Sequence, residues 1–247
     1  MHLFLPETKV ISTCAENGAK LGVVLQNRFN PPMADVKNLL QEDGLGELLL
    51  GNATVRWYRP QQYYEDEWHG TREMDGGVLL NQAIHHVDAL NWLMGDVHSV
   101  FAYMDTLAHQ IETPDVAVAT IRFVNGAMAT IEASTVSYPK NIEGSVALFG
   151  ERGSVKIGGT ALNRKVFWKV DGQLDLEKDI LAKEAIDPPT VYGYSHKTQI
   201  KEMIAAVRED RQPLTNGYEA RRSLHLVLAM HESAETGGEV ILNPCCR

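Results

Sequence analysis

Apolar positions along the chain change their period several times, and each period predicts a type of element. Strict alternation of apolar and polar residues predicts a strand, whereas apolar residues at every third or fourth position predict a helix that buries one side. Helical patterns occur at residues 6–17, 76–94, 195–208 and 216–236. Strand patterns fill the middle of the chain, at residues 46–58, 97–106, 116–124, 127–135, 143–149, 154–157 and 166–170.

Short turns connect several of these elements. Asn125-Gly126 separates two alternating segments, a strong hairpin signal, and Asp171-Gly172 predicts a second tight turn. Gly237-Gly238 is expected to end the last helix. Strands joined by short turns pair in the antiparallel direction. We therefore expect an α+β fold with a large, mainly antiparallel sheet, one face covered by helices and the other available to another subunit.

The first thirty residues follow a different pattern. The helix at residues 6–17 has Pro6 near its first turn and Gly18 just past its end. Residues 21–25 are a continuous apolar run, which is typical of a strand buried on both faces of a parallel sheet. One helix and one strand cannot form a sheet by themselves. We expect residues 1–30 to be the remnant of a separate domain and residues 31–247 to form a second domain.

Composition narrows the class of protein. With 44% hydrophobic residues in 247, the chain can bury a sizeable core. A net charge of −9 argues against nucleic acid or an anionic membrane as the main partner. The apolar residues 3–5 are stopped by Pro6, too soon for a signal peptide or membrane span. Three cysteines form no disulfide framework, so we expect a reducing, cytoplasmic setting.

Candidate chemistry is concentrated on the helical pattern at residues 76–94. At roughly 100° per residue, Asn81, His85, Asp88 and Trp92 fall in a stripe about 60° wide. An amide and an imidazole one turn apart could hold two adjacent hydroxyls of a substrate, and Asp88 could orient the imidazole. A buried helix whose polar groups satisfy nearby carbonyls would contain the same residues, and this interpretation stays open.

A metal site is the other chemistry that these residues suggest. His85, His86 and Asp88 have side chains that can ligate zinc. However, His86 points about 100° away from His85 on a helix, so only two ligands converge. We therefore expect no metal.

Residues 57–69 contain five aromatic side chains between a strand pattern and the helix. Aromatic rings there could stack on sugar rings or a base, and Arg59 could bind a phosphate or carboxylate. Alternatively, the rings cover the sheet edge and anchor the loop, which is the commoner role of aromatic residues.

The glycine pair at 76–77, followed by Asn81-x-x-x-His85-x-x-Asp88 and Trp92, resembles the substrate-side motif of the glucose-fructose oxidoreductase and inositol dehydrogenase (Gfo/Idh/MocA) family. Further similar segments lie at residues 27–31, 44–47, 196–199, 221–223 and 232–234. The resemblance implies that further residues bind substrate, namely Asn27, Arg28, Trp92, Tyr192 and His196. For His196, a capping or core role stays open.

The resemblance also implies a function. It predicts an NAD- or NADP-dependent oxidoreductase that acts on a secondary alcohol of a sugar, sugar nucleotide or polyol, with His85 accepting or donating the hydroxyl proton and Asp88 orienting it. Asn81 stands where many members have Asp. Because an amide is no base, Asn81 would hold a hydroxyl or the nicotinamide amide. Asn at this position resembles the branch that oxidises nucleotide-linked sugars.

Two family features are absent from the sequence. It has no Gly-x-Gly-x-x-Gly for the dinucleotide pyrophosphate, since Gly44-Leu45-Gly46 has no third glycine and follows a helical pattern. It also has no Glu-Lys-Pro. By resemblance, residues 1–30 would be the last αβ unit of the dinucleotide-binding domain, and we expect no NAD or NADP binding by this chain alone. A catalytically silent, truncated sugar-binding module is the alternative.

Assembly is the last expectation. Alternate residues between 116 and 131 are apolar on both sides of the predicted hairpin, so the second face needs cover. We expect a homo-oligomer, a dimer or tetramer, formed through the sheet.

Overall fold

The fold is dominated by one eight-stranded sheet. The computed structural model describes residues 5–159, 161–174, 177, 180 and 195–242. The strand order across the sheet is β7-β6-β5-β1-β4-β3-β2-β8. Every neighbouring pair is antiparallel except β1 and β4, which run parallel. The strands are β1 (Leu48–Arg56), β2 (Val97–Asp105), β3 (Val116–Phe123), β4 (Met128–Ser134), β5 (Glu143–Gly150), β6 (Gly153–Gly158), β7 (Arg164–Val170) and β8 (Val240–Ile241).

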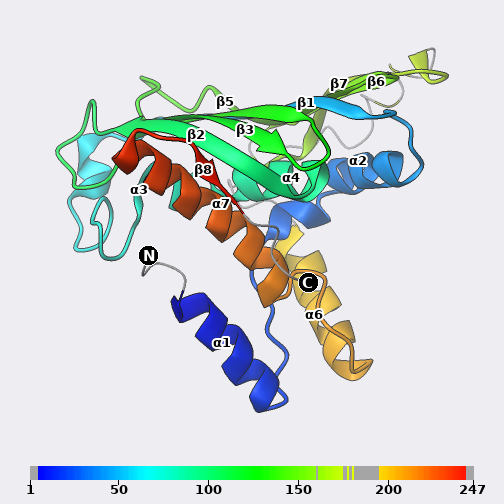
Figure 1. Cartoon of the computed structure of the whole chain (residues 1–247), viewed down its shortest axis with the longest axis horizontal. Helices are drawn as coiled ribbons and strands as arrows, with labels where there is room; N and C mark the ends of the chain where they lie inside the picture. The colour runs from blue at the N-terminus through cyan, green and yellow to red at the C-terminus, as the bar shows by residue number, and fades with distance from the viewer. Residues whose placement is uncertain (1–4, 160, 175–176, 178–179, 181–194, 243–247) are drawn as a thin grey trace.

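The helices lie on one side of this sheet (Figure 1). α4 packs on β1 and α7 packs on β2, whereas α1 and α6 extend away from the sheet. This arrangement confirms the predicted α+β fold with helices on one face. The helices are α1 (Leu5–Glu16), α2 (Pro31–Gln41), α3 (Gly77–Leu80), α4 (Ile84–Met94), α6 (Ser195–Arg208) and α7 (Gly217–Thr236), with short 3₁₀ turns η1 (Gln26–Phe29) and η2 (Gln61–Tyr64).

The hairpin of β3 and β4 shows how the alternating sequence becomes two faces. Ile121 and Phe123 are buried towards the helices, whereas Val118 is 49% exposed on the other face. The turn has the predicted chemistry, since Gly126 has φ 90° and the Phe123 N–H donates to Ala127 O over 2.8 Å. Apolar residues therefore do lie on both faces of this hairpin, as predicted.

Glycine permits close packing between the sheet and its helices. A Cβ at Gly51 of β1 would lie 2.9 Å from Leu90 Cδ1 and 3.0 Å from Met94 Sδ. Both α4 side chains are buried in the core. Gly51 thus lets α4 lie directly on the middle of the sheet, which fixes the helix that carries His85.

The predicted strand at residues 21–25 is wrong in this structure. The segment is extended but forms a single bridge, between Gly22 and Asn216, and Val24 is 57% exposed. Its Val23 N–H donates to Thr215 O over 2.8 Å. A buried strand needs a neighbour along its whole length, and the described residues provide one only at this bridge.

The predicted helix at residues 76–94 is broken into α3 and α4. The Ala83 N–H donates to Val78 O, five residues back, which widens the turn between the two helices. Gly77, with φ 80°, starts α3 where an added Cβ would lie 2.9 Å from Pro114 O. The break changes the helical phase, so Asn81 does not share a continuous stripe with His85.

The helices α1, α6 and α7 match their predicted ranges closely, whereas α2 was not among the predicted helices. α7 begins after Asn216, whose Oδ1 accepts from the N–H groups of Tyr218 and Glu219, and it ends at Gly237 with φ 68°. Across the described part of the chain, no helix is long and apolar enough to cross a membrane.

Candidate substrate site around His85

His85 presents an unpaired, buried ring nitrogen at the first turn of α4. Its Nδ1 is buried and has no hydrogen-bond partner among the described residues. Burial lowers the pKa of His85, the charge of Asp88 opposes this shift, and His196 lowers the pKa further. The imidazole is therefore neutral near pH 7, the form that can accept a proton.

Three further buried polar groups, on η1, on α6 and just before α4, also lack partners among the described residues, and none was identified from the sequence. Among the residues that the structure describes, Gln26 Oε1, Gln82 Nε2 and Ser195 Oγ have no hydrogen bond. Gln26 lies in η1, Gln82 lies just before α4, and Ser195 is the first residue of α6. η1 contacts both α4 and α6, so it brings these elements together. Unpaired buried polar atoms are costly and mark groups that a bound ligand could satisfy.

Asp88 is committed to an ion pair and not to His85. Arg28 Nε and Nη2 donate to Asp88 Oδ2 and Oδ1, each over 2.8 Å, and Ser223 Oγ donates to Asp88 Oδ1 over 2.6 Å. Arg28 Nη1 also donates to Glu219 Oε2 over 2.9 Å. Among the described residues, Asp88 therefore makes no hydrogen bond to His85, and it acts on His85 through its charge, which raises the His85 pKa. The carboxylate instead joins η1, α4 and α7.

The guanidinium of Arg28 remains charged inside this cluster. Burial alone would lower the pKa of Arg28, but the hydrogen bonds and charges of Asp88 and Glu219 more than compensate and raise it. Trp92 lies against the same cation, with Arg28 Cζ 5.3 Å from its ring centre, and Lys37 Nζ lies 5.0 Å from that centre. Two predicted substrate residues, Arg28 and Trp92, thus contact each other.

Asn81 is hydrogen-bonded to the loop before α3. Its Nδ2 donates to Asp75 Oδ1, and Asp75 Oδ2 accepts from the Gly70 N–H over 2.8 Å. The amide therefore ties the end of α3 to the loop before it. The predicted pairing of Asn81 with His85 on one helix face is not what the structure has.

The other predicted residues have different surroundings. Asn27 is buried in η1, next to Arg28. His196 lies in the first turn of α6, close enough to influence the pKa of His85. Tyr192 lies outside the described residues. Arg59 Cζ lies 5.2 Å from the ring centres of both Trp57 and Tyr63, which supports the alternative that the aromatic loop anchors itself.

His86 turns towards the core. It is 2% exposed, its ring meets Trp57 edge-on with centroids 5.8 Å apart, and a Cβ on Gly144 would lie 2.8 Å from its Nε2. Burial lowers the pKa of His86 to about 3. His86 is therefore a neutral core residue that points in a different direction from His85 on α4. Within the described residues, no three His, Cys, Asp or Glu side chains are grouped as a metal site would need.

Comparison with known proteins identifies the family. The model of the GFO/IDH/MocA C-terminal domain matches residues 33–156. The chain belongs to the GFO/IDH/MocA family. Its fold is similar to the WlbA dehydrogenase from Bordetella pertussis in complex with NADH and UDP-GlcNAcA, with TM-score 0.88 and 38% identity over 96% of this chain and 68% of that chain. The corresponding complex of WlbA from Chromobacterium violaceum gives TM-score 0.85 and 36% identity over 96% of this chain and 67% of that chain.

A curated relative is more distant. YrbE, an uncharacterized oxidoreductase of Bacillus subtilis (strain 168), is 28% identical over 159 residues, which cover 61% of this chain and 44% of that protein. The putative oxidoreductase YteT of the same organism is 25% identical over 99 residues, which cover 38% of this chain and 23% of that protein. The chain thus spans less than half the length of the curated relatives that it matches.

Proposed function

We propose that this chain is the substrate-binding part of a nicotinamide-dependent dehydrogenase that oxidises a secondary alcohol of a nucleotide-linked sugar. The observation that carries the proposal is the neutral imidazole of His85, whose buried Nδ1 is unpaired among the described residues. The sugar-nucleotide class is supported by the 38% identity to a dehydrogenase in complex with NADH and UDP-GlcNAcA.

His85 would accept the proton of the hydroxyl being oxidised. A neutral imidazole in a water-poor site is suited to this task, since it gains a proton without first losing one. Gln26, Gln82 and Ser195 supply hydrogen-bonding atoms on neighbouring elements that could hold other hydroxyls of the sugar. The ion pair of Arg28 and Asp88 would hold η1 and α4 in the relative positions that this binding needs.

This chain alone does not contain the residues that a dinucleotide cofactor needs. A dinucleotide needs a glycine-rich turn at a helix N-terminus for its pyrophosphate, and the sequence has no Gly-x-Gly-x-x-Gly. In dehydrogenases of this kind the nicotinamide removes the hydride. We propose that residues 1–30 belong to the unit that provides the dinucleotide site, and that NADH binding by the 247-residue chain is not saturable.

Binding is the first test. Isothermal titration of the chain with UDP-GlcNAcA should show saturable binding, and His85→Ala should weaken it, whereas His98→Ala, at an exposed position near the start of β2, should not. Titration with NADH, followed by tryptophan fluorescence, should show no saturation. Absence of UDP-GlcNAcA binding would contradict the proposed substrate class.

Turnover is the second test. A chimera that places the dinucleotide domain of a WlbA dehydrogenase before this chain should reduce NAD in the presence of substrate. His85→Ala in the chimera should lower kcat by roughly 10²- to 10⁴-fold, the usual effect of losing a general base. A chimera that binds substrate tightly but never reduces NAD would favour the alternative, a sugar-binding module without catalysis.

Two further expectations remain proposals. We propose that the protein works in the cytoplasm, because its three cysteines form no disulfide framework. We also propose that it forms a homo-oligomer through the face of the sheet that carries no described helix.

A further inference from the structure

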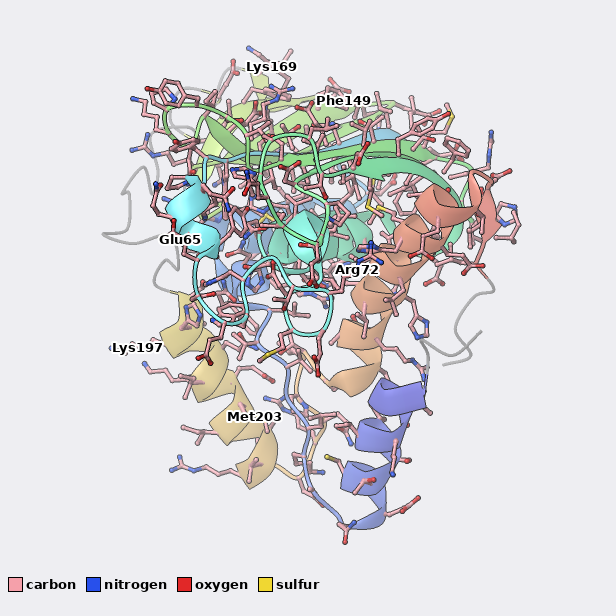
Figure 2. The ribbon with its side chains drawn as sticks, turned by 90° about the vertical axis from the view of Figure 1, so that its left-hand side faces the viewer. Glu65, Arg72, Phe149, Lys169, Lys197 and Met203 are labelled. Carbon is pink, nitrogen blue, oxygen red and sulfur yellow. The ribbon has the colours of Figure 1, made fainter. Side chains whose placement is uncertain are left out.

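A separate cavity of about 390 Å³ lies between the last turns of α7 and the loops before α3 and β3. Its apolar wall includes Leu80, Met104 and Leu228, and its polar wall includes Thr113 and His231. None of the residues proposed above for the His85 site lines it. Figure 2 shows Arg72, another lining residue, beside α7.

Two polar atoms of this cavity have no partner. Thr113 is only 3% exposed, and its Oγ1 has no hydrogen bond among the described residues. His231 Nε2 is likewise buried and unpaired within the described part of the chain. Leaving such groups unsatisfied is energetically unfavourable. Two of them in one cavity indicate a site where a bound molecule supplies the missing hydrogen bonds.

Charged groups of both signs surround the opening. Arg72 is exposed, its Nε donates to Glu112 O over 3.2 Å, and no hydrogen bond from its two Nη atoms to a described residue is found. A guanidinium with free Nη donors matches a carboxylate through two parallel hydrogen bonds. Glu112 is already tied to this loop, because its Oε2 accepts from the Arg72 N–H over 3.0 Å.

The remaining charge at the cavity is negative. Asp105 and Glu235 line it from β2 and α7, and both are exposed. Burial lowers the pKa of His231, which the charge of Glu235 only partly opposes, so this imidazole adds no positive charge near pH 7. With Glu112, three carboxylates and one guanidinium therefore line the cavity. This excess attracts a cation, whereas Arg72 attracts an anion.

We propose that this cavity binds a small zwitterion of the amino-acid class. Arg72 holds its carboxylate, Asp105 and Glu235 hold its ammonium group, and the apolar wall of Leu80, Met104 and Leu228 accepts its side chain. Thr113 and His231 hydrogen bond to polar atoms of the ligand. The cavity size lies within the range of small-molecule sites.

The test is a binding screen of the full chain against the free L-amino acids by ligand-observed NMR, with titration calorimetry on those that bind. At least one amino acid should bind saturably. Its N-acetyl derivative lacks the ammonium group and its methyl ester lacks the carboxylate. The affinity of each should therefore be lower by a factor of about ten or more. A simple alkylamine or carboxylate that binds as tightly as the amino acid would overturn the proposal, as would a screen without any binding.

Variants locate the binding. Arg72→Met and Thr113→Val keep side-chain size and should each weaken binding about tenfold. Arg208→Met, at the exposed end of α6, is the matched control and should leave affinity unchanged. Circular dichroism checks that each variant is folded. Amino-acid binding that survives both Arg72→Met and Thr113→Val would overturn the assignment to this cavity. Neither result depends on binding of a sugar nucleotide at His85.

Discussion

Arg28 and Asp88 form a bidentate ion pair in the interior, with both guanidinium-to-carboxylate distances at 2.8 Å and side-chain exposures of 6% and 2%. The two residues are far apart in sequence, in η1 and α4. Breaking a buried pair on one side leaves an uncompensated charge, which is costly even where the pair itself contributes little. The pair is therefore best tested by removing one partner and then both.

Asp88→Asn should lower the free energy of unfolding by about 3–5 kcal/mol, because Arg28 keeps its charge in a buried site. The double variant Arg28→Met, Asp88→Leu should recover part of this loss. Urea denaturation gives both values. Asp96→Asn, which breaks the exposed pair with Arg222, is the control and should cost no more than about 1 kcal/mol. An Asp88→Asn variant as stable as the wild type would contradict the role of this pair.

His86 should make the protein less stable in mild acid. Its pKa is about 3 in the fold, against about 6.5 for an ordinary histidine. Between these values the unfolded chain binds a proton at His86 and the folded chain does not. The free energy of unfolding should therefore fall as pH falls from about 6.5 to about 3, by up to about 1.4 kcal/mol per pH unit from this residue.

His86→Leu removes this titration and should flatten the pH dependence in that window, as measured by urea denaturation at several pH values. His98→Leu, at an exposed position, is the control. A pH dependence that is identical in wild type and His86→Leu would show that the ring is protonated in the fold.

Asp115 should contribute stability that is lost in stronger acid. Its carboxylate accepts from the N–H groups of Leu107, Ala108 and His109 over 2.8–3.0 Å. Burial raises the pKa of Asp115, but these hydrogen bonds and the one from the His109 ring lower it below its usual value. The contribution is complete above the unfolded pKa of about 3.9 and disappears as pH falls through the lower folded pKa.

Asp115→Asn should be destabilising already at pH 7, since one amide oxygen replaces two carboxylate oxygens and leaves donors unpaired at about 1–3 kcal/mol each. Asp115→Asn should also reduce the amount by which the free energy of unfolding falls in the acid range described above. Exposed Asp171→Asn keeps a residue suited to its turn and serves as control. If both variants are equally stable at pH 7, Asp115 does not hold the loop as the structure indicates.

The face of the sheet without a described helix should mediate self-association. Tyr103, Val118 and Met128 are 71%, 49% and 52% exposed on neighbouring strands β2, β3 and β4. Val118→Lys should shift the protein towards monomer in light scattering at micromolar concentration, because burying a lysine at the contact is unfavourable. Leu107→Lys, exposed in a loop, should have no effect. A wild-type monomer would refute this prediction.

Local patterns were sufficient for most of the fold and insufficient for the site. The β3–β4 hairpin followed from Asn125-Gly126 and α7 from Asn216 and Gly237, because turns and caps are determined by nearby residues. Residues 21–25 were misassigned, since a strand also needs a partner that its own sequence does not specify. The stripe of Asn81 and His85 failed because the helix breaks between α3 and α4, where the Ala83 N–H donates to Val78 O. Asp88 was placed correctly on α4, but its partner Arg28 lies in η1, beyond the reach of helical periodicity.

The central position of β1 has a consequence for synthesis on the ribosome. β1 is the first strand of this sheet to be made, yet both of its neighbours, β4 and β5, come much later in the chain. Its two edges therefore stay unpaired while the chain grows, and exposed edges promote aggregation. The β2–β4 and β5–β7 meanders can each form from local contacts, but neither completes the sheet. The sheet is complete only when β1 joins the two halves. A nascent chain stalled before β5 therefore holds a half-sheet in which one edge of β1 is still unpaired.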